Sequence, residues 1–182
     1  MIKMSDDLPL SEKDIRLLLS DLDKTKGFKA MLYLVLGTGI SIPECITIKL
    51  EDVDYKQNLI RIYDKHLSRN RLVKMNPTII KATSQYQDGR YRASERLFDI
   101  SEFTAWNRLS QHSQEKLKRT VSWTAIRRTW AVLAFKEGIG FKDMMESSGA
   151  TADQLSGWSL YAKENGVNKD PPDILANIIR HL

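Results

Sequence analysis

Lysine and arginine side chains are the residues of this sequence best placed to do chemistry together, because they gather in its middle third. Residues 65–128 hold 14 Lys/Arg and 5 Asp/Glu, a net charge of +9. Residues 1–64 (9 − 11) and 129–182 (5 − 7) each have a net charge of −2. A basic zone in an acidic frame is typical of a polyanion-binding face, since each neutralised phosphate releases counterions. The alternative is a solvated basic surface.

Metal, disulfide and nucleotide chemistry find little support in the sequence. Cys45 is the one cysteine, and the three histidines are scattered, so neither a disulfide nor a Cys/His metal site is expected. Gly37-Thr38-Gly39 lacks the lysine and the spacing of a phosphate-binding P-loop. The paired acids Glu51 and Asp52 are typical of a solvated helix end. We therefore expect no cofactor.

Length and composition indicate one compact domain. A chain of 182 residues with 42% apolar residues is long enough to bury a core and too short for two ordinary domains. Its longest nearly uninterrupted apolar stretch, Ala30–Leu36, is far below the roughly 18 residues that span a bilayer. The N-terminus has no secretory apolar region. We expect a cytoplasmic protein.

Capping residues and hydrophobic spacing predict mostly helices. Ser11, with an acid three residues later, predicts a helix over 11–23, and dense apolar spacing predicts a buried helix over 26–36. Ser41, followed by a proline in the first turn, predicts a short helix to about Ile48. Further helices are predicted over 76–85, from Ser101, over 123–135, over 142–148, from Thr151, and after Pro171-Pro172.

In one place the hydrophobic pattern changes from helical spacing to the two-residue alternation of β-strands. Leu59–Tyr63 and Arg71–Met75 predict an antiparallel pair joined by a basic loop over 64–70. The predicted fold class is therefore mainly α (α+β), with a small antiparallel β-sheet. The predicted organisation is an N-terminal tail over 1–8, one domain over 9–170, and a C-terminal amphipathic helix over 171–182.

Two segments resemble motifs of a known family. Thr38-Gly-Ile-Ser-Ile-Pro-Glu-Cys-Ile-Thr-Ile-Lys-Leu-Glu-Asp-Val-Asp54 is similar to T-G-L-R-x-S-E-L-x-x-L-x-W-x-D-(I/V)-D in the catalytic domain of tyrosine recombinases, the phage integrase family. Thr124-Ala-Ile-Arg-Arg-Thr-Trp-Ala131 resembles that family's H-x-L-R-R-T-x-A. The two motifs flank a basic β-hairpin in the family's order, and the resemblance covers about residues 9–165. It implies the helical catalytic-domain fold of that family.

The resemblance also implies a chemistry. In the family, a tyrosine attacks a DNA phosphodiester while two arginines, a hairpin lysine and His/Trp donors bind the phosphate and protonate the leaving oxygen. Carried over by position, the first arginine falls on Ser41 and the hairpin lysine on Lys65 or His66. The motif histidine falls on Thr124, and the second arginine is retained as Arg127.

The remaining positions of that chemistry are also changed. The third donor falls on Ala150 and the nucleophile on Ser159. Tyr161 lies two residues further, about 200° around a continuous helix, unless Gly157 breaks that helix. Loss of one preorganised donor typically costs ~10²–10³ in rate, and several are missing together. We therefore expect the protein not to be an enzyme.

A DNA-binding role without strand cleavage is the function that these residues predict. The resemblance to degenerate recombinases that act as lysogeny repressors, such as those of SPβ-type phages, favours a phage or mobile-element transcriptional regulator that binds specific double-stranded DNA. The candidate DNA contacts are Arg61, Lys65, His66, Arg69, Arg71, Lys74, Arg90, Arg92, Lys116, Lys118, Arg119, Arg127 and Arg128. Two alternatives are an active recombinase that uses Tyr161 and an accessory protein of recombinase assemblies.

The C-terminal segment predicts a second kind of partner. Its apolar stripe suits self-association, because the family packs this helix onto a neighbouring subunit; the stripe is Ile174, Leu175, Ile178, Ile179 and Leu182. In the family a helical domain precedes this one, and together they close around duplex DNA. We therefore expect the chain to be one domain cut from a longer protein.

Overall fold

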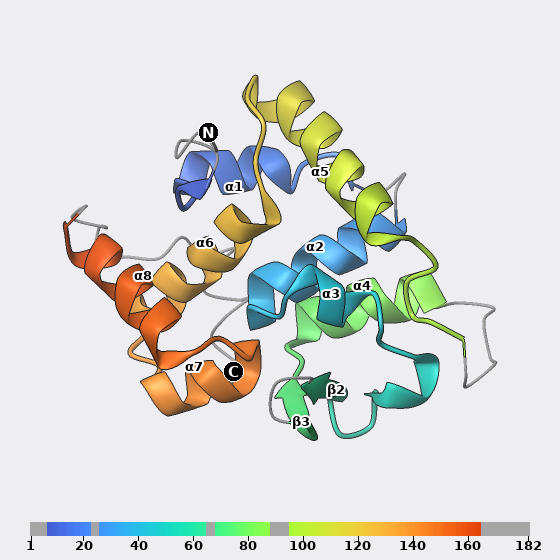
Figure 1. Ribbon diagram of the computed structural model, residues 1–182. Coiled ribbons are helices and arrows are strands. Elements are labelled where there is room, and N and C mark those ends of the chain that lie inside the picture. Colours follow the sequence, from blue (N-terminus) through green and yellow to red (C-terminus); the bar gives the residue numbers. More distant parts are fainter. Residues whose placement is uncertain (1–6, 23–25, 65–67, 88–94, 165–182) are drawn as a thin grey trace.

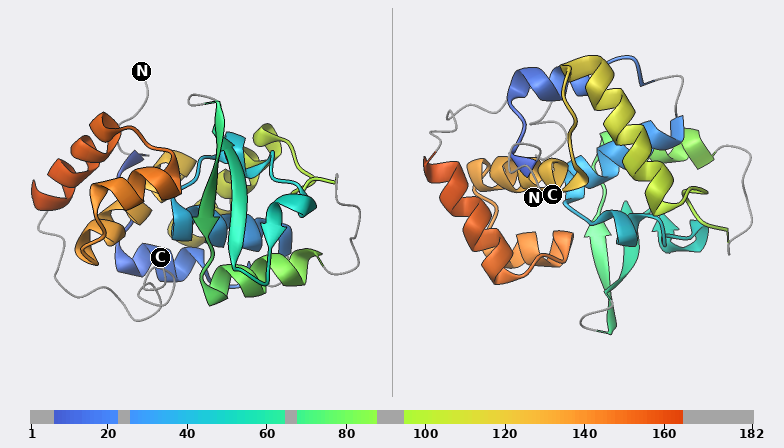
Figure 2. Two further views of the ribbon diagram at one scale, coloured as in Figure 1. Left: turned by 90° about the horizontal axis from the view of Figure 1, so that it is seen from below. Right: turned by 45° about the horizontal axis from the view of Figure 1, so that its top comes forward.

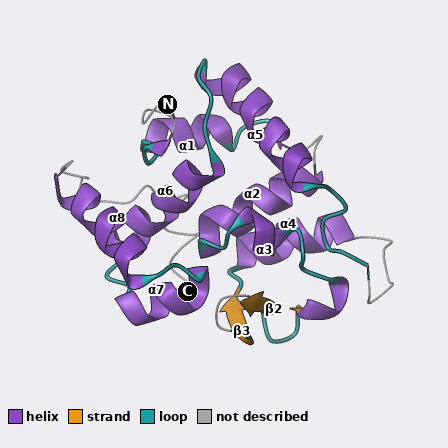
Figure 3. Ribbon diagram, viewed as in Figure 1, coloured by secondary structure: helices purple, strands orange, loops and turns teal. Residues whose placement is uncertain are grey.

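The computed structural model describes residues 7–22, 26–64, 68–87 and 95–164, with the side chains of 161–164 outside that description. Within these residues the chain is mostly helical with one small sheet (Figures 1 and 3). The helices are α1 Glu12–Leu18, α2 Lys26–Thr38, α3 Ile42–Cys45, α4 Pro77–Gln87, α5 Glu102–Leu117, α6 Trp123–Lys136, α7 Phe141–Ser148 and α8 Ala152–Glu164. A 3-10 turn, η3 Leu50–Asp52, leads into strands β1 Val53–Asp54, β2 Leu59–Asp64 and β3 Arg69–Lys74.

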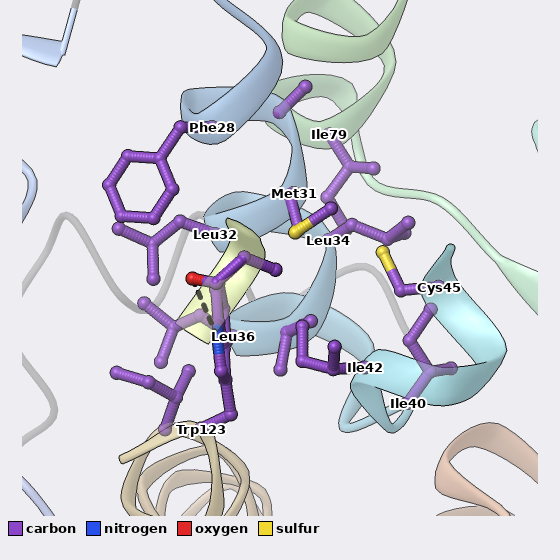
Figure 4. Close-up of a cluster of buried hydrophobic side chains, with 14 of the residues drawn as sticks. Phe28, Met31, Leu32, Leu34, Leu36, Ile40, Ile42, Cys45, Ile79 and Trp123 are labelled. Atoms are coloured by element: carbon purple, nitrogen blue, oxygen red, sulfur yellow. Dashed lines mark hydrogen bonds between the residues drawn. The ribbon is translucent and has the colours of Figure 1, made fainter. Parts of the chain in front are cut away.

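Helix α2 runs through the middle of the molecule (Figure 1). Most of its run from Phe28 to Leu36 is apolar and buried, with Lys29 and Tyr33 half-buried, and α4 and α6 pack against it. Figure 4 shows its side chains meeting Ile42 and Cys45 of α3, Ile79 of α4 and Trp123 of α6. The side chains of this core each stabilise the fold by about 1.5–3 kcal/mol through burial.

A second, smaller cluster fixes the C-terminal helices. Trp130 and Ala134 of α6 pack against Met144 of α7 and against Ala150 and Leu155, which lie at and after the turn into α8. Figure 1 shows α7 and α8 as a layer beside α6. Beside this cluster, the Ser147 hydroxyl donates to the carbonyl of Thr38 at 2.8 Å and ties the end of α7 to the end of α2.

The sheet is antiparallel in the order β1-β2-β3, and β2 and β3 form a projecting hairpin (Figure 2). Ile60 pairs with Val73 and Ile62 with Arg71, and these four side chains face the body of the molecule. Val53 and Asp54 add a third strand that the sequence pattern did not predict, because two residues are too few to show alternation.

The predicted fold class is confirmed, and the differences lie at element ends. Helix α1 stops at Leu18 rather than at residue 23, and α3 stops at Cys45 rather than at about Ile48. Strand β3 begins at Arg69, so the hairpin loop is shorter than predicted. Helix α8 continues through Gly157 without a break. Residues 1–6 of the tail predicted over 1–8 and the C-terminal helix predicted over 171–182 lie outside the described residues.

No helix in the described part of the chain is both long enough and apolar enough to span a membrane. Within the same residues, no group of three or more His, Cys, Asp or Glu side chains is arranged to hold a metal ion.

Candidate nucleic-acid interface

The first motif folds into a tight turn and the capped start of α3. Ser41 has the extended backbone of an N-cap, and its hydroxyl accepts a bond from the backbone N–H of Glu44 at 3.4 Å. The Glu44 carboxylate closes the capping box, because Oε2 accepts from the Ser41 backbone N–H at 2.9 Å and from its hydroxyl at 2.8 Å. Ser41 therefore serves as the helix cap predicted from the sequence, and it aims Glu44 at the hairpin.

An arginine from β3 occupies the space beside this cap. Arg71 lies on the inward face of the hairpin, opposite Ile62, and its side chain is only 9% exposed. Its Nη1 donates to Oε1 of Glu44 at 2.6 Å, and Oδ2 of Asp64 lies 3.9 Å away from the same nitrogen. A single carboxylate thus joins the hydroxyl of Ser41 to the guanidinium of Arg71.

Helix α6 contributes a second guanidinium. Arg127 donates from Nε to the carbonyl of Gly39 at 2.8 Å and from Nη2 to the carbonyl of Ser148 at 3.2 Å. Its Cζ lies 5.6 Å from the ring centroid of Trp158 on α8, a cation–π contact. Arg127 therefore joins the end of α2, the end of α7 and the face of α8.

Arg71 and Arg127 are close enough to interact electrostatically. Burial lowers the pKa of Arg127 from its ordinary value, Glu44 opposes that shift, and the positive charge of Arg71 adds to it. The guanidinium stays protonated, because an arginine is charged at all working pH values. We call the group formed by Ser41, Glu44, Arg71 and Arg127 the arginine pocket.

The turn after α7 closes over this pocket. Gly149 has a φ of +65°, and a Cβ built on it would stand 3.0 Å from both Cζ and Nη2 of Arg71 and 3.1 Å from Oε1 of Glu44. No side chain fits there without displacing the guanidinium. Glycine at 149 is thus required both by the left-handed backbone and by the close approach of Arg71.

The positions carried over for acid–base and nucleophilic chemistry hold a threonine, an alanine and a serine. Thr124 is half-buried in the first turn of α6, and Ala150 is buried with only a methyl group to offer. Ser159 is half-buried on α8. Because α8 is continuous, Ser159 and Tyr161 stand about 200° apart around one helix axis. The side chain of Tyr161 lies outside the described residues.

Comparison with known proteins now decides the family. Residues 9–149 match the model of the phage integrase family. The chain belongs to that family. The relatives include tyrosine recombinase XerA of Saccharolobus solfataricus, 26% identical over 175 residues, which cover 90% of this chain and 59% of the relative. XerD of Pseudomonas putida is 31% identical over 121 residues, covering 58% of this chain and 40% of the relative.

Solved structures of this family share the fold. A crystal structure of XerA recombinase matches with a TM-score of 0.70 at 19% identity, over 92% of this chain and 62% of that one. XerH bound to palindromic difH substrate in a post-cleavage complex matches with a TM-score of 0.72 at 14% identity, over 88% of this chain and 51% of that one. The chain spans about two fifths to three fifths of the length of these relatives.

Within the phage integrase fold, the predicted DNA contacts fall into two groups. The first surrounds the hairpin: Arg61, Arg69 and Lys74 are exposed, and Arg61 is bonded to Asp52 at 2.9 Å. Arg71 and Arg127 belong to the arginine pocket. Arg71 connects the hairpin with the pocket, because it lies on β3 and Gly149, which follows the Ser148 carbonyl bonded by Arg127, approaches its guanidinium.

The second group lies around the end of α5, which Figure 1 places at the opposite end of the molecule from the hairpin. Its members each have a local partner: Lys116 bonds Asp21, Lys118 bonds the carbonyl of Glu115, Arg119 bonds Asp14, and Arg128 of α6 bonds the carbonyl of Asp7. Lys65, His66, Arg90 and Arg92 lie outside the described residues. All of these DNA contacts remain predictions.

Sequence reasoning missed the place of Arg71 and the role of Glu44 in the pocket. The signal was available, because strand side chains alternate between faces and Val73 is plainly a core residue. Arg71, two residues earlier, must share its face. Glu44 is the acid of the family's first motif, and its second function, as the ion-pair partner of Arg71, depends on a contact across 27 residues.

Proposed function

We propose that this protein binds specific double-stranded DNA through a recombinase fold that no longer cleaves it, and acts as a transcriptional regulator of a phage or mobile element. One observation carries the proposal: the pocket keeps two guanidinium groups, Arg71 and Arg127, while Thr124 and Ala150 stand where proton donors are needed. Guanidinium groups hold phosphate at all working pH values. A threonine hydroxyl and a methyl group supply no general acid near neutral pH.

The loss of donors weighs more against cleavage than against binding. Phosphate contacts add affinity one by one through counterion release, so binding survives the loss of any single group. Strand cleavage requires charge stabilisation and protonation of the leaving oxygen in the same transition state, and each missing donor costs ~10²–10³ in rate. The relatives support the DNA partner, since XerH and the Tn1549 integrase are both solved as complexes with DNA.

Salt dependence tests the binding half of the proposal. With the five described cations near the hairpin in contact with phosphates, the log–log slope of affinity for a mixed-sequence duplex against salt is expected at about −4.5. Lys74→Met, which removes an exposed hairpin cation, makes the slope shallower by about 0.9, whereas Arg16→Met on α1 leaves it unchanged. Absence of binding at low salt would favour the accessory-protein alternative.

Specificity requires its own measurement. Selection of tight binders from a pool of random duplexes should yield one sequence motif, bound about 10³-fold or more tighter than mixed DNA. A pool that yields no motif contradicts a regulator and leaves only a general DNA-binding role.

A second candidate function is an active recombinase that uses Tyr161. Arg71 favours it, because this arginine restores a guanidinium beside Ser41, where the family motif carries one. The two functions separate on covalent chemistry: an active recombinase forms a phosphotyrosyl bond to DNA, and the regulator forms none.

A further inference from the structure

The guanidinium of Arg71 has one edge in use and one edge without a partner. Nη1 donates to Glu44, whereas Nε and Nη2 are buried and, among the described residues, have no hydrogen-bond partner. Buried donors are nearly always paired, and leaving one unpaired costs about 1–3 kcal/mol, more when the group is charged. Two such donors on one side chain indicate a missing acceptor.

The geometry of this edge restricts the acceptor. Nε–H and one N–H of Nη2 point in parallel and form a fork that binds two oxygens of a phosphate or carboxylate at once. The two nearby carboxylates are on the other side: Glu44 bonds Nη1, and Asp64 approaches Nη1 at 3.9 Å. A Cβ built on Gly149 would stand 3.0 Å from Cζ and from Nη2 of Arg71, so the Nη2 end of the open edge lies beside this turn.

Glu44 fixes this fork next to the position that has lost its arginine. Oε1 of Glu44 accepts from Arg71, and Oε2 of the same carboxylate accepts from the Ser41 hydroxyl. Arg127 lies close enough for the charge of Arg71 to act on it, so two cations share the space around one carboxylate. Two like charges brought together in a buried site favour the binding of an anion.

We propose that Arg71 delivers from β3 the phosphate-binding guanidinium that the family motif carries at position 41, with its Nε–Nη2 fork as the contact. The inference rests on the proposed DNA binding and adds the residue that makes it possible without the motif arginine. Since both donors of the fork are covered in the free chain, the segments around them, including the turn at Gly149 beside Nη2, must move when a phosphate enters.

Arg71→Lys isolates the fork from the charge. Lysine keeps a cation beside Glu44 but presents a point charge in place of the parallel N–H pair. We expect folding to be retained, as judged by the melting temperature, and affinity for a mixed-sequence duplex at low salt to fall about ten- to hundredfold. Arg16→Lys, the same change on exposed α1, should alter affinity by less than about twofold. An Arg71→Lys protein that binds like the wild type overturns the inference.

A rescue experiment tests directly whether the guanidinium of residue 71 takes the place of one at residue 41. Arg71→Met removes the guanidinium, and the double variant Ser41→Arg/Arg71→Met returns one to the motif position. We expect the double variant to regain most of the affinity lost in Arg71→Met. If Ser41→Arg does not restore the DNA affinity lost in Arg71→Met, then Arg71 serves to hold the hairpin in place. That result would overturn the proposal that Arg71 replaces the motif arginine.

Failure of the role proposed for Arg71 can be distinguished from failure of the proposed DNA-binding function. If the wild-type protein binds duplex DNA with a steep salt slope and all Arg71 variants do the same, the regulator stands and the role of Arg71 falls. If the wild-type protein does not bind DNA at low salt, the proposed function fails, and the role of Arg71 fails with it.

Discussion

Gly39→Ala is expected to lower the free energy of unfolding by about 2–5 kcal/mol, measured by urea denaturation. Gly39 has a φ of +72°, a conformation that costs an L-residue about 1–2 kcal/mol. A Cβ at this position would also enter the indole ring of Trp130. Trp130 is fully buried and has no room to swing away, so the overlap must be relieved by moving α6 or the turn.

Gly138→Ala is the matched control. Gly138 has a nearly equal φ of +76°, but nothing lies within 4 Å of a Cβ built there. Gly138→Ala should therefore lower the free energy of unfolding only by the conformational cost of a positive φ, about 1–2 kcal/mol. The difference between the two variants therefore measures the clash with Trp130, and equal losses would contradict the packing of this turn. Gly39→Ala should also weaken DNA binding, because the Gly39 carbonyl accepts a hydrogen bond from Arg127.

Arg127→Met is expected to reduce both stability and DNA affinity. Methionine fills similar space but removes two charged hydrogen bonds, to the carbonyls of Gly39 and Ser148, and the contact with Trp158. Hydrogen bonds to charged groups contribute about 1.5–3 kcal/mol each, and the relief of guanidinium burial offsets part of that. We expect a net loss of about 2–3 kcal/mol in the free energy of unfolding. The salt slope of DNA binding should become shallower by about 0.9.

The neighbouring arginine provides the comparison. Arg128→Met removes the same charge from the same helix, but within the described part of the chain Arg128 makes a single hydrogen bond, from Nη1 to the carbonyl of Asp7. Its loss of stability should be about 1 kcal/mol. If Arg127→Met destabilises no more than Arg128→Met, then Arg127 does not join α2 to α7 as the structure indicates.

Local sequence patterns predicted most of the fold. Serines 11, 41, 101 and 122 each accept a bond from a backbone N–H three residues on, and three of these caps could be predicted because the chemistry of a helix start is confined to four residues. The hairpin followed from alternation, which also spans few residues. Helix ends were less predictable, since the last turn depends on tertiary packing rather than on one residue.

The candidate site was predictable only in part, for a related reason. The two motifs identified Ser41 and Thr124 as altered positions and Arg127 as a retained one, because each motif is contiguous in the sequence. The contact between Arg71 and Glu44 joins residues 27 apart, and the bond from Arg127 to Gly39 joins residues 88 apart. Contacts of that kind depend on how hairpin and helices pack, which no local pattern reports.

The central claim, a retained phosphate grip without strand cleavage, is tested most directly with a nicked suicide duplex that traps any covalent intermediate. The duplex should carry the sequence selected as the tightest binder, and native binding and denaturant-resistant adduct should be measured in one sample, with an active XerA on its own site as the positive control. We predict that this protein binds the duplex and forms no covalent adduct. A covalent protein–DNA adduct that Tyr161→Phe abolishes would contradict the account.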